Sequence, residues 1–160
     1  MKILNDRSTV FRYIEIPLSD KDNKKISKIV IDSRNVKEDC LFFGLEGQNT
    51  NGSLFAEEAL QNGASLVVSS NKSIAMDSPN HIFHESPIDA MGKIASGIIN
   101  DFTGNIIGVT GSSGKTTVKN LIQHTLNDCF GTIGNYNNEI GLPFSVMNLS
   151  QNHKTAVFEL

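Results

Sequence analysis

The stretch IIGVTGSSGKTT at residues 106–117 joins a β-branched run to an amphipathic stretch, and this order predicts a strand, a phosphate-binding loop and a helix. Glycines let such a loop turn tightly and direct its backbone N–H groups at phosphate oxygens, and the helix adds the positive end of its dipole. Lys115 is predicted to reach the β- and γ-phosphates, and the Thr116 hydroxyl is predicted to hold Mg²⁺. The stretch therefore predicts a site for a nucleoside triphosphate.

The loop departs from the usual pattern at one position. Val109 stands where the pattern has a glycine, five positions before Gly114, so the match is to a TGxxGKT variant. A glycine-rich turn that binds nothing is the alternative, but Gly-Lys-Thr at a helix start has little purpose without a phosphate. Apolar residues at steps of three and four predict one buried helical face, made of Val118, Leu121, Ile122, Leu126 and Cys129.

Composition limits the class of protein. A chain of 160 residues can bury one ordinary core or two small ones, and its net charge of -3 gives no broad attraction to nucleic acid or anionic membranes. Cys40 and Cys129 have no cysteine or histidine neighbours at metal-binding spacing, which indicates reduced thiols. The N-terminus lacks the apolar core of a signal peptide, and no stretch is long enough to span a bilayer. We therefore expect a cytoplasmic protein without membrane insertion.

The first part of the chain has its own α/β pattern. Gly63 stands where the C-cap glycine of a helix over residues 53–62 belongs, and the polar stretch 70–80 is predicted to be a surface loop. Ser86 and Pro87 are predicted to be the N-cap and first residue of a helix that extends to about Asp101. The predicted strands of this part are residues 28–31, 40–45, 64–69 and 81–83.

The second part is predicted to begin with the strand at residue 105. After the loop helix, the glycines and asparagines of residues 131–143 predict irregular backbone, followed by a short helix over 143–148 and a strand over 155–160. The predicted fold is α/β, with a small N-terminal α/β substrate-binding domain followed by a truncated P-loop α/β ATPase domain. The predicted limits are residues 1–84 for the first domain, 85–104 for a connecting helix and linker, and 105–160 for the second.

Such a nucleotide-binding domain needs further strands to cover both faces of its sheet. We therefore expect the chain to be a truncated piece of a longer protein that lacks a C-terminal domain. The uncovered sheet edge and apolar face are expected to favour self-association or partial unfolding after about residue 105.

Four sequence features together resemble the Mur ligases of bacterial cell-wall synthesis. They are Asp32-Ser33-Arg34, the run from Leu41 to Gly47, the TGxxGKTT loop, and the GNxNNxIGxP segment from Gly134 to Pro143. The last segment resembles the branch that adds D-alanyl-D-alanine to UDP-N-acetylmuramoyl-tripeptide. The resemblance implies an N-terminal domain for the uridine nucleotide, a central ATPase domain and a C-terminal Rossmann-like domain.

The resemblance also implies a reaction and a set of site residues. ATP phosphorylates a substrate carboxylate, the amine of D-alanyl-D-alanine attacks the acyl phosphate, and phosphate leaves. Lys115 is the residue expected to be catalytic, and Thr116 and Glu159 are expected to bind Mg²⁺. Ser33, Arg34, Asn135, Asn137 and Asn138 are expected to contact the substrates. The residues expected to bind ATP are Gly111, Ser112, Ser113, Gly114, Lys115, Thr116 and Thr117.

Each of these roles has a plainer alternative. Glu159 is also compatible with a strand-end carboxylate in water, Arg34 with a surface salt bridge, and the asparagines with ordinary loop chemistry. The family often has an acidic-glycine-His-Asp-Phe sequence where this chain has NGSLF at residues 51–55, which puts the contacts of that loop in doubt. His81 and His84 do not form a metal pair in this interpretation, because an offset of three on a strand places them on opposite faces.

The leading hypothesis is an ATP-dependent amide ligase of peptidoglycan precursor synthesis. We expect the full enzyme to be monomeric and this piece to be inactive alone. One alternative is another Mur ligase, such as the diaminopimelate-adding enzyme, or a folate-glutamate ligase. A second alternative is a non-catalytic module that binds a nucleotide.

Overall fold

The computed structural model describes residues 2–17, 24–47, 50–75, 78–132 and 138–160. Contacts divide the chain into one compact unit of residues 5–93 and another of residues 1–4 and 94–160, so the division falls within helix α4 (Pro87–Asp101). The predicted domain limits of 1–84, 85–104 and 105–160 stay a prediction.

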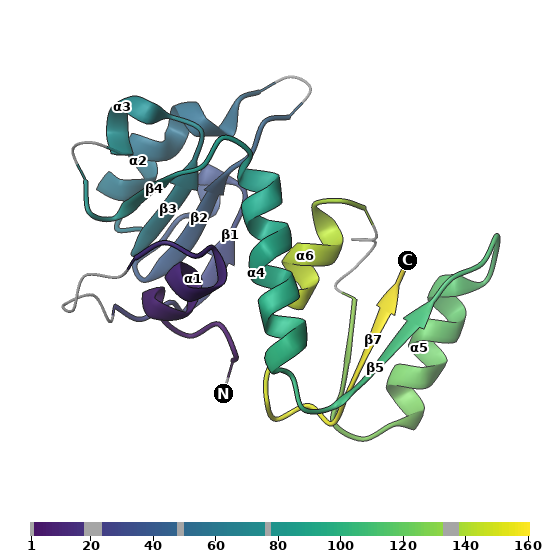
Figure 1. The fold of residues 1–160 in the computed structure, drawn as a ribbon. Coiled ribbons are helices and arrows are strands. Elements are labelled where there is room, and N and C mark those ends of the chain that lie inside the picture. Colours follow the sequence, from purple (N-terminus) through teal and green to yellow (C-terminus); the bar gives the residue numbers. More distant parts are fainter. Residues whose placement is uncertain (1, 18–23, 48–49, 76–77, 133–137) are drawn as a thin grey trace. The chain divides into compact units, whose positions relative to one another are not determined.

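A parallel sheet organises the unit of residues 5–93. Its strands are β1 (Lys28–Val30), β2 (Cys40–Gly44), β3 (Leu66–Ser69) and β4 (His81–Phe83), arranged in the order β1-β2-β3-β4 (Figure 1). Every residue of β2 and β3 is buried, as expected for parallel strands that are covered on both faces. The predicted α/β class is therefore confirmed for this part of the chain.

Short helical elements connect these strands. The predicted helix over residues 53–62 is divided into a 3-10 helix, η2 (Gly52–Phe55), and the α-helix α2 (Ala56–Gln61). Gly63 follows with a φ of +90°, which confirms its expected place after the helix. The apolar spacing of residues 53–62 also predicts that Leu54 lies on the buried side of this helix, but Leu54 is 73% exposed. Ala56 and Ala59 turn the buried side of α2 toward Phe42 and Val67 of the sheet.

Two helices of this unit were not predicted. The stretch predicted to be a loop over 70–80 contains α3 (Lys72–Ala75), and residues near the N-terminus form α1 (Arg7–Tyr13). The Asp6 side chain caps α1 by accepting a hydrogen bond from the Thr9 N–H. Arg7 is fully buried and donates to the Asn80 side chain at 2.8 Å and to the Pro79 carbonyl. Helices this short depend on such contacts, because their own propensity is insufficient.

Helix α4 begins as its sequence predicts. Pro87 is its first residue, and the Ser86 hydroxyl accepts a hydrogen bond from the Asp89 N–H at 3.2 Å. The helix ends at Asp101, also as predicted, although Gly92 and Gly97 lower its intrinsic propensity. Helix capping and apolar burial together therefore outweigh the two glycines.

The other unit contains a second parallel sheet. Its strands are β5 (Asn105–Val109), β6 (Cys129–Gly131) and β7 (Thr155–Glu159), arranged in the order β5-β7-β6. Figure 1 shows β5 and β7 side by side. Helix α5 (Lys115–Thr125) follows β5, and α6 (Gly141–Val146) precedes β7. Val109 pairs with Glu159 in the β5–β7 register, so both strands end at the same edge of the sheet. The strand, loop and helix predicted from residues 106–117 are therefore all present.

Several details of this unit differ from the prediction. Cys129 lies in β6 rather than on the helical face, and the predicted helix over 143–148 begins at Gly141 and ends at Val146. The side chains of Val118 and Leu121 are 46% and 62% exposed, whereas Lys119 is buried. In the described residues α5 packs on β6 and β7 with Lys119 buried and Ile122 half-buried, so the buried face is shifted from the predicted one toward Lys119.

Burial of His81 predicts an acid-sensitive fold. Its Nε2 lies 2.6 Å from the Ser69 hydroxyl, and burial lowers the pKa of His81 below its ordinary value of 6.5. The unfolded chain then binds the proton at a higher pH than the folded chain. Stability is therefore expected to be present above about pH 6.5 and lost as the pH falls through the lowered pKa of folded His81.

Urea unfolding between pH 5 and 8 measures this effect. The His81→Gln variant cannot take up the proton and should show a flatter pH dependence below pH 6.5. The exposed His124 offers a matched control, because His124→Gln removes an imidazole from the surface rather than from the core. A His81→Gln variant that loses stability in acid as steeply as the wild type would show that another group is responsible.

Candidate functional site

Two glycines shape the loop between β5 and α5. Gly111 has a φ of +152°, and Gly114, the N-cap of α5, has a φ of +77° in the left-handed region. Gly114 has no side chain that could cap the first turn of α5, and uncapped N–H groups at a helix start suit an anion. Val109, at the position where the usual pattern has glycine, is the buried last residue of β5 and leaves this geometry intact.

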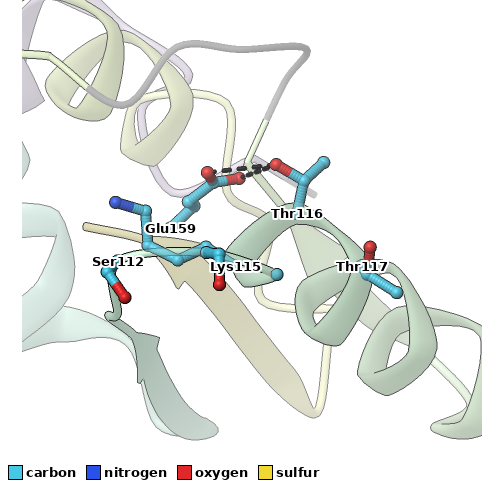
Figure 2. Close-up of a pocket in the computed structure, with 7 residues that line it drawn as sticks. Ser112, Lys115, Thr116, Thr117 and Glu159 are labelled. Carbon is cyan, nitrogen blue, oxygen red and sulfur yellow. Dashed lines mark hydrogen bonds between the residues drawn. The ribbon is translucent and has the colours of Figure 1, made fainter.

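The loop and the end of β7 line a cavity of about 360 Å³ that is open to solvent. Figure 2 shows Ser112 on the loop, Lys115, Thr116 and Thr117 on the first turn of α5, and Glu159 on β7. A lysine, four hydroxyl side chains and the backbone N–H groups of the loop suit a polyphosphate. The structure therefore brings together six of the seven residues predicted to bind ATP, with Gly111 at the entrance to the loop. The residues that line the cavity are Ser112, Ser113, Gly114, Lys115, Thr116, Thr117 and Glu159.

Glu159 lies directly beside Thr116. The Thr116 hydroxyl donates to the two carboxylate oxygens at 2.9 and 3.1 Å, although the residues are 43 positions apart in the chain (Figure 2). Glu159 is 5% exposed, so a carboxylate in water does not describe it. A hydroxyl and a carboxylate at one edge of a phosphate cavity are the hard oxygen donors that Mg²⁺ prefers, and this pair fits the predicted metal site.

Two residues next to this pair were not predicted from the sequence. The Thr132 hydroxyl accepts the backbone N–H of Glu159 at 2.9 Å, and the Lys119 ammonium donates to the Thr132 carbonyl at 3.3 Å. Thr132 and Lys119 are each 4% exposed. The available signal was the position of Lys119, three residues after Thr116 and therefore on the same face of α5.

Of the three asparagines predicted to contact the substrates, Asn138 is the one that the structure describes. Asn138 accepts the Gly141 N–H on its side chain at 2.7 Å and the Leu142 N–H on its carbonyl at 3.0 Å. These bonds stabilise the start of α6, which is the ordinary loop chemistry that asparagine provides. Asn135 and Asn137 lie outside the described residues. The substrate role of all three stays a prediction.

Ser33 and Arg34 form the 3-10 helix η1 (Ser33–Asn35) directly after β1. Arg34 donates to the Asp32 carboxylate from Nε at 2.9 Å and from Nη2 at 2.6 Å, and its side chain is 87% exposed. These hydrogen bonds lower the pKa of Asp32. The pair is therefore a surface salt bridge in this structure, and contact with a uridine nucleotide stays a prediction for both residues.

Ser53 connects two loops at the carboxyl edge of the first sheet. It belongs to the NGSLF segment, where the chain departs from the family pattern. The Ser53 hydroxyl donates to the Gly44 carbonyl at 2.9 Å and accepts the Ser70 N–H at 3.0 Å. Gly44 ends β2 and Ser70 follows β3, so Ser53 fixes the loops after two neighbouring strands. Ligands of parallel α/β sheets bind at this edge.

Gly114 permits a direct test of the loop conformation. An alanine Cβ at this position would meet no atom within 4 Å, so the cost of Gly114→Ala is conformational. The left-handed region costs a non-glycine residue about 1–2 kcal/mol, and we expect this loss in the free energy of unfolding. Gly92→Ala in α4 is the matched control, because its Cβ is also unobstructed. There the helix should be stabilised by about 0.5–1 kcal/mol. Equal changes in the free energy of unfolding of Gly114→Ala and Gly92→Ala, measured in urea, would contradict this prediction.

Comparison with protein families gives two matches. Residues 25–99 match the family described as Mur ligase family, catalytic domain, and residues 109–160 match the Mur ligase middle domain. The two matches together span most of the chain. The second match contains the whole phosphate loop, from Gly111 to Thr117, and Glu159.

Individual relatives agree with this assignment. The chain is 36% identical over 138 residues to the UDP-N-acetylmuramoyl-tripeptide–D-alanyl-D-alanine ligase of Buchnera aphidicola, which covers 84% of the chain and 30% of the relative. It is also 36% identical over 124 residues to the UDP-N-acetylmuramoyl-L-alanyl-D-glutamate–2,6-diaminopimelate ligase of Caldanaerobacter subterraneus, covering 74% of the chain and 26% of the relative.

A solved structure is similar as well. The MurF ligase of Thermotoga maritima in complex with ADP superimposes with a TM-score of 0.74 at 36% identity, over 82% of this chain and 31% of that one. The chain thus spans about a third of the length of the relatives it matches. None of the helices in the described part of the chain has the length and apolar character needed to cross a membrane.

Proposed function

Because this chain belongs to the Mur ligase family, we propose that it forms the nucleotide-binding part of an ATP-dependent ligase in peptidoglycan precursor synthesis. The proposed reaction joins D-alanyl-D-alanine to UDP-N-acetylmuramoyl-tripeptide. One observation carries the proposal: Glu159 lies against Thr116 in a cavity that the phosphate loop lines. A structural turn without a ligand does not require a buried carboxylate there.

In the proposed reaction, this site binds and neutralises the charge of the transferred phosphoryl group. The γ-phosphoryl group of ATP passes to the terminal carboxylate of the peptide, the amine of the dipeptide attacks the resulting acyl phosphate, and phosphate leaves. The N–H groups at the start of α5 and the Lys115 ammonium stabilise the charge that develops during this transfer. Lys115 is the residue to which we assign the catalytic role.

Thr116 and Glu159 are the residues that would hold Mg²⁺. Both residues line the cavity, and the Thr116 hydroxyl is within hydrogen-bond distance of the Glu159 carboxylate oxygens. When bound, the ion supplies charge neutralisation for the phosphates. Because Glu159 is buried, its carboxylate is held next to the Thr116 hydroxyl.

The remaining roles follow the family. We propose that Ser33 and Arg34 contact the uridine nucleotide and that Asn135, Asn137 and Asn138 contact the peptide substrates. Arg34 would exchange its exposed bond with Asp32 for a pyrophosphate, which is a stronger partner for a guanidinium fork. We propose a monomeric cytoplasmic enzyme that binds no nucleic acid, consistent with a net charge of -3.

A diaminopimelate-adding ligase is the second candidate, because a relative of that kind matches at the same identity over a shorter stretch. The test uses the protein encoded by the complete reading frame that contains residues 1–160, called the complete protein below. Release of phosphate from ATP is measured with each acceptor amine and its matching UDP-linked peptide. The proposal expects release with D-alanyl-D-alanine and the tripeptide, whereas release with diaminopimelate alone would favour the second candidate. No Mg²⁺-dependent release with either would overturn the proposal.

A further inference from the structure

Lys119 is a buried cation close to the candidate metal site. It is 4% exposed, and its ammonium donates to the Thr132 carbonyl at 3.3 Å. Among the residues that the structure describes, no carboxylate forms a salt bridge with it. A buried ammonium is costly without an anion, so a position that keeps one calls for an explanation beyond packing.

Thr132 is held at three points. Its N–H donates to the Val157 carbonyl at 3.1 Å, its hydroxyl accepts the Glu159 N–H at 2.9 Å, and its carbonyl accepts from Lys119. Two of these bonds attach it to β7, and the third attaches it to α5. Thr132 therefore links the nucleotide helix to the strand that ends in Glu159.

These bonds close a ring. Thr116 and Lys119 are three residues apart on one face of α5, and each reaches toward the end of β7. The Thr116 hydroxyl contacts the Glu159 carboxylate, and Lys119 contacts the same residue indirectly through Thr132. The ring thus holds both the side chain and the backbone of Glu159 relative to α5.

We propose that Lys119 is a positioning residue that acts through Thr132 to hold Glu159 at the metal site. This inference rests on the proposed function, because it takes Glu159 to be a ligand for Mg²⁺. A Mg²⁺ ion held by Thr116 and Glu159 would compete with the hydrogen bond between them. The bonds through Thr132 do not involve these oxygens, so they keep Glu159 in place when that hydrogen bond is replaced.

Two substitutions separate this role from ordinary packing. Lys119→Met keeps an unbranched apolar chain and removes the ammonium, and Thr132→Val keeps the shape and removes the hydroxyl that accepts from Glu159. Each is expected to weaken ATP binding in Mg²⁺ by about threefold to tenfold and to leave binding in EDTA unchanged, since hydrogen bonds have modest net strength. The double variant should lose little more than either single one, because both changes break one linkage.

The experiment measures ATP affinity of the complete protein by calorimetry, with and without Mg²⁺, together with its thermal unfolding. Thr132→Ser retains the hydroxyl and should bind close to wild type. Lys154→Met is the matched control, because Lys154 is an exposed lysine at the opposite end of β7. If Lys119→Met fails to fold, the comparison of Thr132→Val with Thr132→Ser decides the question.

The outcomes are distinct. Mg²⁺-dependent weakening in Lys119→Met and Thr132→Val supports the inference. Wild-type affinity in both variants overturns it, and so does equal weakening with and without Mg²⁺, which a purely structural role predicts. A wild-type protein that shows no Mg²⁺-dependent binding of ATP would instead overturn the proposed function.

Discussion

Replacing Lys115 by alanine is expected to lower kcat/KM for ATP by about 10²–10³-fold in the complete protein. The Lys115 side chain lines the phosphate cavity at the first turn of α5, next to the loop residues Ser112, Ser113 and Gly114. Removal of one preorganised donor to developing charge typically costs a factor of this size. The effect should appear in kcat more than in KM, because the transferred phosphoryl group carries the developing charge.

Steady-state rates of phosphate release at varied ATP concentrations measure this effect. Lys154→Ala removes the same charge from an exposed site at the other end of β7 and should stay within about twofold of wild type. Lys115→Arg keeps the charge but changes its shape, so an intermediate rate is expected. A Lys115→Ala enzyme with a third or more of the wild-type kcat/KM would contradict the assignment of this lysine.

Glu159→Gln is expected to change ATP binding in opposite directions with and without Mg²⁺. The glutamine oxygen can still accept from the Thr116 hydroxyl, so the packing around this buried side chain is preserved. Loss of the charged oxygen should weaken Mg²⁺-dependent binding by about tenfold to a hundredfold, which corresponds to about 1.5–3 kcal/mol. Without Mg²⁺ the variant should bind ATP as well as wild type or better, because a negative charge no longer repels the phosphates.

Calorimetric titration of ATP in Mg²⁺ and in EDTA measures both expected changes in affinity, the loss with Mg²⁺ and the retention or gain without it. The exposed Glu57 on α2 provides the matched control, and Glu57→Gln should leave both affinities unchanged. Equal weakening of Glu159→Gln in the two buffers would indicate a packing role for the carboxylate. Wild-type affinity in Mg²⁺ would exclude Glu159 as a ligand.

The elements that were predicted correctly are those whose signal is local. The apolar runs of β2 and β3, the Ser86-Pro87 start of α4 and the glycines of the phosphate loop all act through residues within a few positions of one another. Local signals also explain an error. The apolar spacing of Val118 and Leu121 predicts a helix correctly, but spacing alone does not show which face the sheet covers.

Helix α1 and the partners of Glu159 needed the tertiary structure. The α1 stretch is only seven residues long and contains Arg7, Ser8, Thr9 and Arg12, so its helical state depends on the cap at Asp6 and on burial of Arg7. Lys119 looks like a solvated lysine in the sequence, because burial of an ammonium depends on residues that are distant in the chain.

The sequence alone was enough to predict an α/β protein with a phosphate loop between a strand and a helix, because strand periodicity and glycine conformation are properties of neighbouring residues. Tertiary structure alone decided that Glu159 meets Thr116 and that Thr132 joins Lys119 to the same strand. The register of β5 on β7 places these residues in contact. A register depends on the packing of a whole sheet and not on any one segment.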